Sequence, residues 1–315
     1  MNLFITTFES VAILLGIGLV GFYIIRRNMI PAHVLSMLSP LALEIALPSL
    51  IFTDIITEFT LEKFPNWWQI PFWWVFFTVI AAILTYILRY VSKQKIRNEF
   101  ALSLFYQNGI FFPLAILSGM FGGDSSYLIT LFIFTIFFPA FFFSSYHIFF
   151  PSKRKKKINI KKIFHPVLIA TLLAIIIKYV NLTETIPKLF INIFEMLGAM
   201  SLPLLMIILG GSMYADYKKE GLKDLKEISK FVFVKNIIFP LIFIGILMLI
   251  KPFVPYRIAL IILLQAAVPP VTALPIVTER MNGNRAIVSQ FMVSSFVLSL
   301  ISIPTMIYLF NLLYK

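Results

Sequence analysis

The residues that could do chemistry are a few polar and helix-breaking residues inside long apolar stretches. Asn108, Gly109 and Pro113 interrupt one stretch, and the adjacent Pro269 and Pro270 interrupt another. Proline removes a helical hydrogen bond and clashes with the preceding turn, so a helix through either stretch should be broken. Backbone groups freed in an apolar environment have to be satisfied by protein or by a watery cavity. We therefore predict a polar binding site where the two breaks lie.

Three side-chain amides accompany the breaks. Asn108 and Gln107 lie in the first, and Gln265 lies just before the second. An amide can both donate and accept hydrogen bonds, which suits a carboxylate or a hydroxyl group. We expect Asn108 to contact a bound molecule, and we include both glutamines in the candidate site. For the glutamines, hydrogen bonds that hold helices together are the stronger alternative.

Glu44 is the most prominent acidic residue, because it lies about ten residues into an apolar stretch. A carboxylate at that depth is costly and is a functional candidate by default. Burial would raise its pKa toward neutrality, which would suit a residue that carries a coupling proton. A charge paired with a neighbouring helix, or a permanently protonated acid, explains it equally well.

Catalytic and metal-binding signatures are absent from the sequence. The chain has no cysteine, which excludes disulfides, thiolate metal sites and cysteine nucleophiles. It has no HExxH, GxSxG or Walker motif, and its three histidines are scattered. We therefore expect no enzyme activity and no cofactor or metal, with a coupling proton or sodium ion as the only small partner besides a substrate.

The composition indicates a membrane protein. Apolar residues make up 60% of the 315 residues, and charged residues only 13%. Soluble domains are about 45–50% apolar and about 25% charged. The lipid bilayer is therefore the expected partner, and a soluble globular, disordered or coiled-coil chain is excluded.

Ten apolar segments can be traced, which predicts an all-α fold of about ten transmembrane helices. Glycines of the first and seventh segments, Gly18, Gly21 and Gly210 among them, should let helices pack closely. The segments are Phe8–Ile25, Val34–Ile56, Trp67–Leu88, Phe100–Met120, Tyr127–Phe149, Pro166–Val180, Ile186–Met213, Phe231–Ile250, Ile258–Val277 and Ala286–Phe310.

The two halves of the chain resemble each other weakly. Leu47-Pro48 in the second segment matches Leu202-Pro203 in the seventh, and Gln107 matches Gln265 at a similar offset. Because each half has five segments, the second must be inverted relative to the first. We expect repeats at residues 1–150 and 166–315, joined by a basic cytoplasmic linker at 151–165, in one membrane domain with helices four and nine broken. Such inverted repeats are typical of transporters.

The charge of +13 is best explained by membrane topology. With the N-terminus outside, the inner connections receive 21 of the 27 lysines and arginines. Lys235 is counted in the fourth inner group, with Lys218, Lys219, Lys223, Lys226 and Lys230. The positive-inside rule then places both termini outside a cell membrane. The basic excess therefore does not indicate a nucleic-acid partner.

Four loose motifs, in order, resemble the auxin efflux carrier family over nearly the whole chain. That family includes plant PIN-type carriers and bacterial malate or malonate permeases. The motifs are Leu41–Phe52 around Pro48, Asn108-Gly109 with Pro113, Leu202-Pro203 through Gly210-Gly211, and Ala267–Pro270 through Glu279-Arg280. The chain departs from the family pattern at Glu44, which is usually neutral, and at Ala273, where many relatives carry Asn.

The resemblance implies a scaffold part and a transport part, with helices four and nine crossing at their proline-containing breaks. The related bile acid and sodium symporters share this architecture. Asn108, Gly109, Pro113, Gln107, Gln265, Pro269 and Pro270 would then lie at the crossover.

We expect a secondary active transporter or uniporter that moves a small organic anion by elevator-like alternating access. A sodium-coupled symporter is the first alternative, and a channel or membrane sensor is the second. The sequence is compatible with a homodimer.

Overall fold

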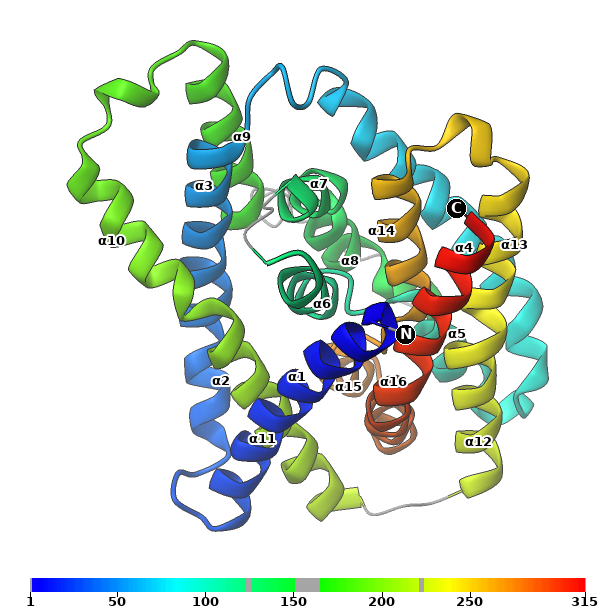
Figure 1. Cartoon of the computed structure of the whole chain (residues 1–315). Helices are drawn as coiled ribbons and strands as arrows, with labels where there is room; N and C mark the ends of the chain where they lie inside the picture. Colours follow the sequence, from blue (N-terminus) through cyan, green and yellow to red (C-terminus); the bar gives the residue numbers. More distant parts are fainter. Residues whose placement is uncertain (1, 123–125, 151–164, 221–223, 315) are drawn as a thin grey trace.

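The computed structural model describes residues 2–122, 126–150, 165–220 and 224–314. Within these residues the chain is helical with short connections and contains no strand. The basic run Lys153–Lys157 lies outside the described residues. Figure 1 shows α2, α3, α9 and α10 on the left, α4, α12, α13 and α14 on the right, and α6 to α8 between them.

The helices follow the apolar segments along the chain. The first half contains α1 (Asn2–Arg26), α2 (His33–Pro40), α3 (Leu47–Glu58), α4 (Ile70–Leu88), α5 (Arg97–Phe105), α6 (Phe111–Phe121), α7 (Ser126–Phe134) and α8 (Phe138–Ser145). The second half contains α9 (Pro166–Tyr179), α10 (Lys188–Ala199), α11 (Ser201–Glu220), α12 (Leu225–Phe233), α13 (Phe239–Leu249), α14 (Tyr256–Ala267), α15 (Leu274–Arg280) and α16 (Arg285–Tyr314).

Among the residues that the structure describes, seven helical stretches are long and apolar enough to cross a membrane. They are Phe4–Arg26, His33–Glu58, Trp67–Val91, Ser126–Phe149, Lys188–Ala215, Leu225–Leu249 and Arg285–Tyr314. The fourth, sixth and ninth expected segments contain shorter apolar helices instead, at Phe111–Phe121, Pro166–Tyr179 and Tyr256–Ala267. The all-α fold is confirmed, whereas the inverted repeat of ten spanning helices stays a prediction.

Two continuous spans contain a turn of π-helix just before a proline. The turn η1 (Leu41–Ala46) precedes Pro48, and η8 (Val234–Ile238) precedes Pro240. A proline ring clashes with the carbonyl four residues earlier, so a wider turn accommodates the ring without ending the helix. The fifth expected span has an unexpected interruption at Thr135–Phe137, followed by Pro139 in the first turn of α8.

Helices α1 and α11 pack with their backbones in close contact. A Cβ atom added at Gly210 would overlap the carbonyl oxygen of Gly18, and one at Gly21 would overlap the backbone of Ile207. Gly16, on the same helix as Gly18, has no such neighbour within 4 Å. The expected packing role of glycine is therefore confirmed at Gly21 and Gly210, but not at Gly16 or Gly18, where an added Cβ atom would meet no close neighbour.

Gly210→Val should lower stability by about 2 kcal/mol or more, because an overpacked contact forces the two backbones apart. Gly16→Val is the matched control, and it should leave the melting temperature in detergent nearly unchanged. Equal losses in the two variants would show that the contact between α1 and α11 does not set this cost.

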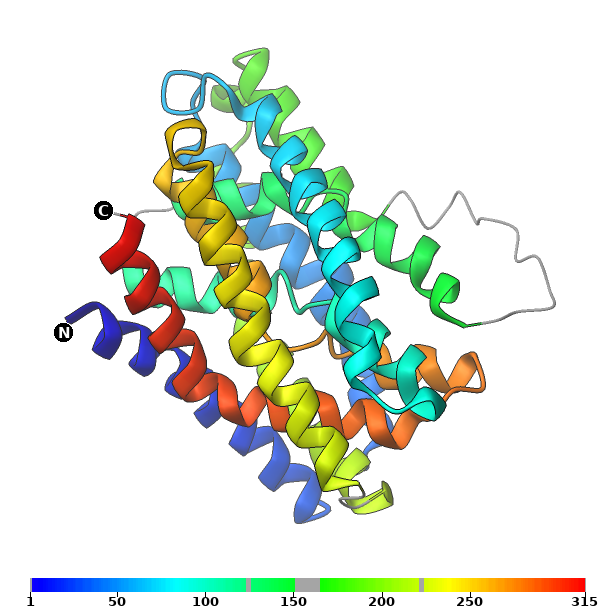
Figure 2. The ribbon, with the colours of Figure 1, turned by 90° about the vertical axis from the view of Figure 1, so that its right-hand side faces the viewer.

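The connections divide between two sides of the molecule. Figure 2 shows both termini at the left and the connections 59–66 and 250–255 at the upper left. The connections 27–32, 89–96 and 281–284, which carry or adjoin basic residues, lie toward the lower right. The termini therefore share one side, as an even number of crossings requires.

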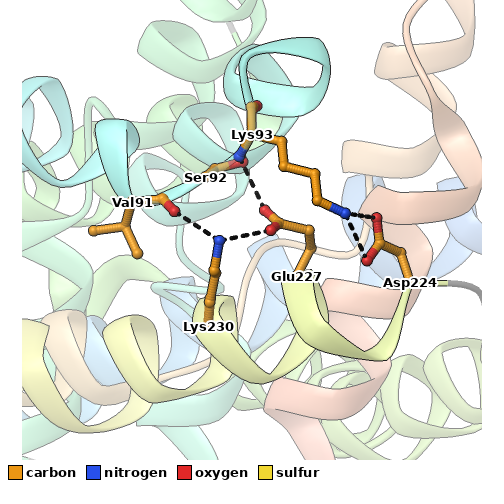
Figure 3. Close-up of polar contacts among 6 residues, drawn as sticks. All are labelled: Val91, Ser92, Lys93, Asp224, Glu227 and Lys230. Atoms are coloured by element: carbon orange, nitrogen blue, oxygen red, sulfur yellow. Dashed lines mark hydrogen bonds and ion pairs between the residues drawn. The ribbon is translucent and has the colours of Figure 1, made fainter.

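A polar cluster ties the connection after α4 to the start of α12 (Figure 3). The buried Glu227 carboxylate accepts hydrogen bonds from the Lys93 backbone N–H at 3.1 Å and from Lys230 Nζ at 2.7 Å. Lys93 Nζ also pairs with Asp224 at 2.8 Å. Hydrogen bonding within this pair raises the pKa of Lys93 and lowers that of Asp224. The cluster fixes the Asp224 end of the α12 span.

Candidate functional site

The two predicted breaks lie directly against each other. Residues 106–110 separate α5 from α6, and residues 268–273 separate α14 from α15. The Asn108 N–H donates to the Pro269 carbonyl at 2.8 Å, and the Val271 N–H donates to the Tyr106 carbonyl at 3.0 Å. Gln107 and Pro270 form an isolated antiparallel bridge. Backbone groups that the breaks remove from helices thus satisfy one another, forming a crossover of residues 106–110 and 268–273.

The two glutamines hold this crossover together. Gln107 Nε2 donates to Gln265 Oε1 at 3.2 Å, and Gln265 Nε2 donates to the Gly109 carbonyl at 2.7 Å. Both side chains are buried. A Cβ atom at Gly109 would overlap Gln265 Oε1, so a larger residue there would displace the Gln265 amide. The hydrogen bonds favour a supporting role for the glutamines, while contact with a substrate stays a prediction.

The Asn108 side chain differs from both glutamines. It is only 2% exposed, and within the described residues neither its Oδ1 nor its Nδ2 has a hydrogen-bond partner. A buried amide left unsatisfied is expensive, at about 1–3 kcal/mol, and requires an explanation such as a ligand. Asn108 is therefore the predicted site residue whose environment most clearly points to a bound molecule.

Asn108 lines a cavity that encloses about 580 Å³, part of it open to the surroundings. Its walls come from η1 and α3, the crossover, α8 and the start of α9, and are mostly apolar. The lining residues are Leu43, Leu47, Asn108, Gly109, Ile110, Phe111, Phe138, Pro139, Phe142, Phe143, His165, Val167, Val271, Thr272 and Ala273.

The cavity adjoins the N-terminus of α6, because Ile110 and Phe111 both line it. The first backbone N–H groups of a helix have no intrahelical partner, and that end carries a partial positive charge. Pro113 lies in the first turn, where its missing N–H costs nothing. Pro113, Pro269 and Pro270 shape the crossover and do not line the cavity.

His165 is a cavity residue that the sequence analysis missed. It caps α9, where its Nδ1 accepts the Val167 N–H at 3.3 Å. The imidazole is then neutral with its proton on Nε2. Burial lowers the pKa of His165, and the negative charge of Glu44 partly opposes that shift. Glu44 itself has an exposed side chain in η1 and does not line the cavity, so its coupling role stays a prediction.

Acidification should destabilise the protein through His165. The unfolded chain takes up this proton near the ordinary value of 6.5, whereas the folded chain, with its lower pKa, does so only at a lower pH. Stability therefore falls as pH drops below 6.5. His165→Asn preserves a helix cap but cannot titrate, so its melting temperature should fall less from about pH 7.5 to about pH 5. Parallel curves for the two proteins would contradict this.

The structure places Lys235 elsewhere than the sequence analysis did. It was counted among the inner connections, but it lies in η8 within the α12–α13 span and is 0% exposed. The rule that assigns basic residues to connections fails here because the buried amine has a partner at the end of α14, beside the crossover: Lys235 Nζ donates to the Ala266 carbonyl at 3.1 Å. The remaining basic residues of that group lie at or before Lys230.

Comparison with known families identifies the family of the chain. The profile of a membrane transport protein family, of the auxin efflux carrier type, matches residues 6–160 and 150–307. None of the curated proteins compared matches the chain significantly. Because the two matches together span nearly all 315 residues, the chain belongs to this family of membrane transport proteins.

Proposed function

We propose that this membrane transporter carries a small organic anion and binds it in the cavity beside the crossover. The observation that carries the proposal is the Asn108 amide, which is buried, unpartnered and next to the N-terminus of α6. An anion would satisfy the amide and the free N–H groups of that helix together. We further propose that the membrane is the cell membrane and that both termini are extracytoplasmic.

The chemistry of the cavity suits a carboxylate on a short carbon skeleton. One carboxylate oxygen can accept from Asn108 Nδ2, and the other can accept from backbone N–H groups in the first turn of α6. The imidazole Nε2–H of His165 and the hydroxyl of Thr272 are further donors around the same cavity. Phe138, Phe142 and other apolar residues would contact the methylene groups.

The way the crossover is built supports alternating access. Its two segments are joined by backbone hydrogen bonds and by Gln265, so they would move together as one rigid part. The cavity is completed by Leu43, Leu47 and His165, which belong to the neighbouring α2–α3 and α9 segments. An elevator-like displacement of the crossover past these segments would carry the anion between the two sides.

Uptake into proteoliposomes tests the proposal. The purified protein should accumulate radiolabelled malonate or malate above protein-free liposomes, and excess unlabelled substrate should saturate uptake. Imposing a pH gradient or a membrane potential separately would distinguish proton coupling from uniport. Single-channel currents that rise with concentration without saturating would instead favour a channel.

A further inference from the structure

A fully buried lysine contacts the end of one broken helix. Lys235 lies in η8 and is 0% exposed. Its Nζ donates to the Ala266 carbonyl at 3.1 Å and lies 5.0 Å from the centre of the Phe239 ring. In the next position of the same turn, Asn236 bonds to Ser295 and Ser302 of α16. Asn236 therefore has several neutral partners, whereas the charged Lys235 has one carbonyl and a ring.

The partner of Lys235 is a carbonyl that proline leaves free. In a continuous helix the Ala266 carbonyl would accept from residue 270, but Pro270 has no N–H. The carbonyl also lies at the carboxyl end of α14, which carries a partial negative charge. Broken helices of carriers use such ends and their free carbonyls to hold a coupling cation. In this chain, the Lys235 side chain occupies the position at the carboxyl end of α14 where such a cation would bind.

No carboxylate neutralises Lys235 within the described residues. Of the helices packed around η8, α13 has no titratable side chain, and the others carry them only toward their ends. Glu227 lies two turns away and is occupied by Lys93 and Lys230, and the buried Glu99 of α5 accepts the Asn284 N–H. The titratable groups on these helices are Lys226, Glu227 and Lys230 of α12, Tyr256 and Arg257 of α14, and Arg285, Tyr308 and Tyr314 of α16.

The ammonium is connected to the substrate cavity through a short path. Ala266 directly follows Gln265, whose side chain donates to the Gly109 carbonyl, and Asn108 precedes Gly109. A change of charge at Lys235 would therefore alter the polarisation of the carbonyl end of α14 and the electrostatic potential felt by an anion at Asn108. In the low dielectric of a protein interior, such an effect extends over several ångströms.

We propose that Lys235 is the built-in coupling cation of this carrier, so that transport is linked to the proton bound by its amine and not to sodium. The inference rests on the proposed anion transport and specifies its coupling. The amine lone pair accepts a proton from water reached from one side, giving the ammonium that accompanies the anion. On the other side, the ammonium releases this proton to water, which returns Lys235 to the neutral amine.

The pH profile of exchange in proteoliposomes tests this role. With equal pH on both sides, malonate exchange by the wild type should slow as pH rises from about 6 to about 9.5, because the ammonium form is lost. Lys235→Arg keeps the charge but cannot release its proton, so its profile should be flat. Lys235→Met should slow exchange at least about tenfold, corresponding to about 1.4 kcal/mol. Replacing sodium by choline should change no rate.

Two control variants test whether the effect is specific to Lys235. Lys226→Met makes the same chemical change at an exposed position of α12, and it should keep the wild-type rate and profile. Glu44→Gln tests the other coupling candidate and should keep the alkaline decline. The proposal is overturned if Lys235→Arg retains that decline, if Lys235→Met exchanges at the wild-type rate, or if sodium accelerates the wild type.

A spectroscopic measurement keeps the proposal testable if no anion is carried. In nanodiscs containing isotope-labelled lysine, the Nζ resonance that disappears in Lys235→Arg is assigned to Lys235. This resonance should change from ammonium to amine across the same pH range. A resonance that stays ammonium throughout overturns the proton-binding role, whereas absent uptake of every anion tested overturns the proposed function alone.

Discussion

Asn108→Asp should abolish malonate uptake, and Asn108→Ala should weaken it strongly. A hydrogen bond to a charged group contributes about 1.5–3 kcal/mol, so loss of the amide should raise KM about tenfold to about a hundredfold. Aspartate has the shape of asparagine, but its carboxylate cannot donate and repels an anionic substrate. Loss in both variants would show that the amide donor is needed, and the larger loss in Asn108→Asp would show the added repulsion between its carboxylate and an anionic substrate.

Binding should be measured apart from transport. Malonate should raise the melting temperature of the wild type in detergent, raise that of Asn108→Ala only at higher concentrations, and leave that of Asn108→Asp unchanged. Asn66→Asp makes the same change in an exposed connection and should behave as the wild type in both assays. If both Asn108 variants take up and bind malonate normally, the cavity beside the crossover is not its site.

The prolines and glycines made the breaks and the closest helix contact predictable. Pro113, Pro269 and Pro270 act through local geometry, which one sequence position determines, and Gly210 acts through its missing side chain. The alignment of Gln107 with Gln265 placed two amides at matching points of the two halves, and the structure shows them hydrogen-bonded to each other. The direct backbone pairing of Asn108 with Pro269 depends on tertiary structure and was not predictable.

Three residues have surroundings that differ from those their sequence positions predicted, because tertiary contacts decide them. Lys235 is four residues inside its apolar segment, a position from which a lysine commonly reaches the membrane surface. It is buried because a distant proline leaves the Ala266 carbonyl free. His165 precedes a helix and is the last residue of the basic linker, so its sequence context indicates a surface and not a cavity. Glu44 was expected to be buried because of its depth in the segment, but its side chain is exposed from η1.

Gln265→Leu should disrupt the crossover itself. The change preserves most of the side-chain volume but leaves the Gln107 amide and the Gly109 carbonyl without the partner that Gln265 provides. Each unsatisfied buried group costs about 1–3 kcal/mol, so stability should fall by about 2 to about 6 kcal/mol. Gln94→Leu, the same change in an exposed connection, should cost far less.

Amide hydrogen exchange should show which part of the structure Gln265→Leu disrupts. The Asn108 and Val271 amides, which pair with the opposite break, should lose protection more than the long helices do, because the crossover would open without global unfolding. Transport should slow together with that loss, since the cavity depends on Asn108 and Gly109 being held in place. Unchanged protection at both amides would mean that backbone pairing alone holds the two breaks together, and that Gln265 serves the substrate directly.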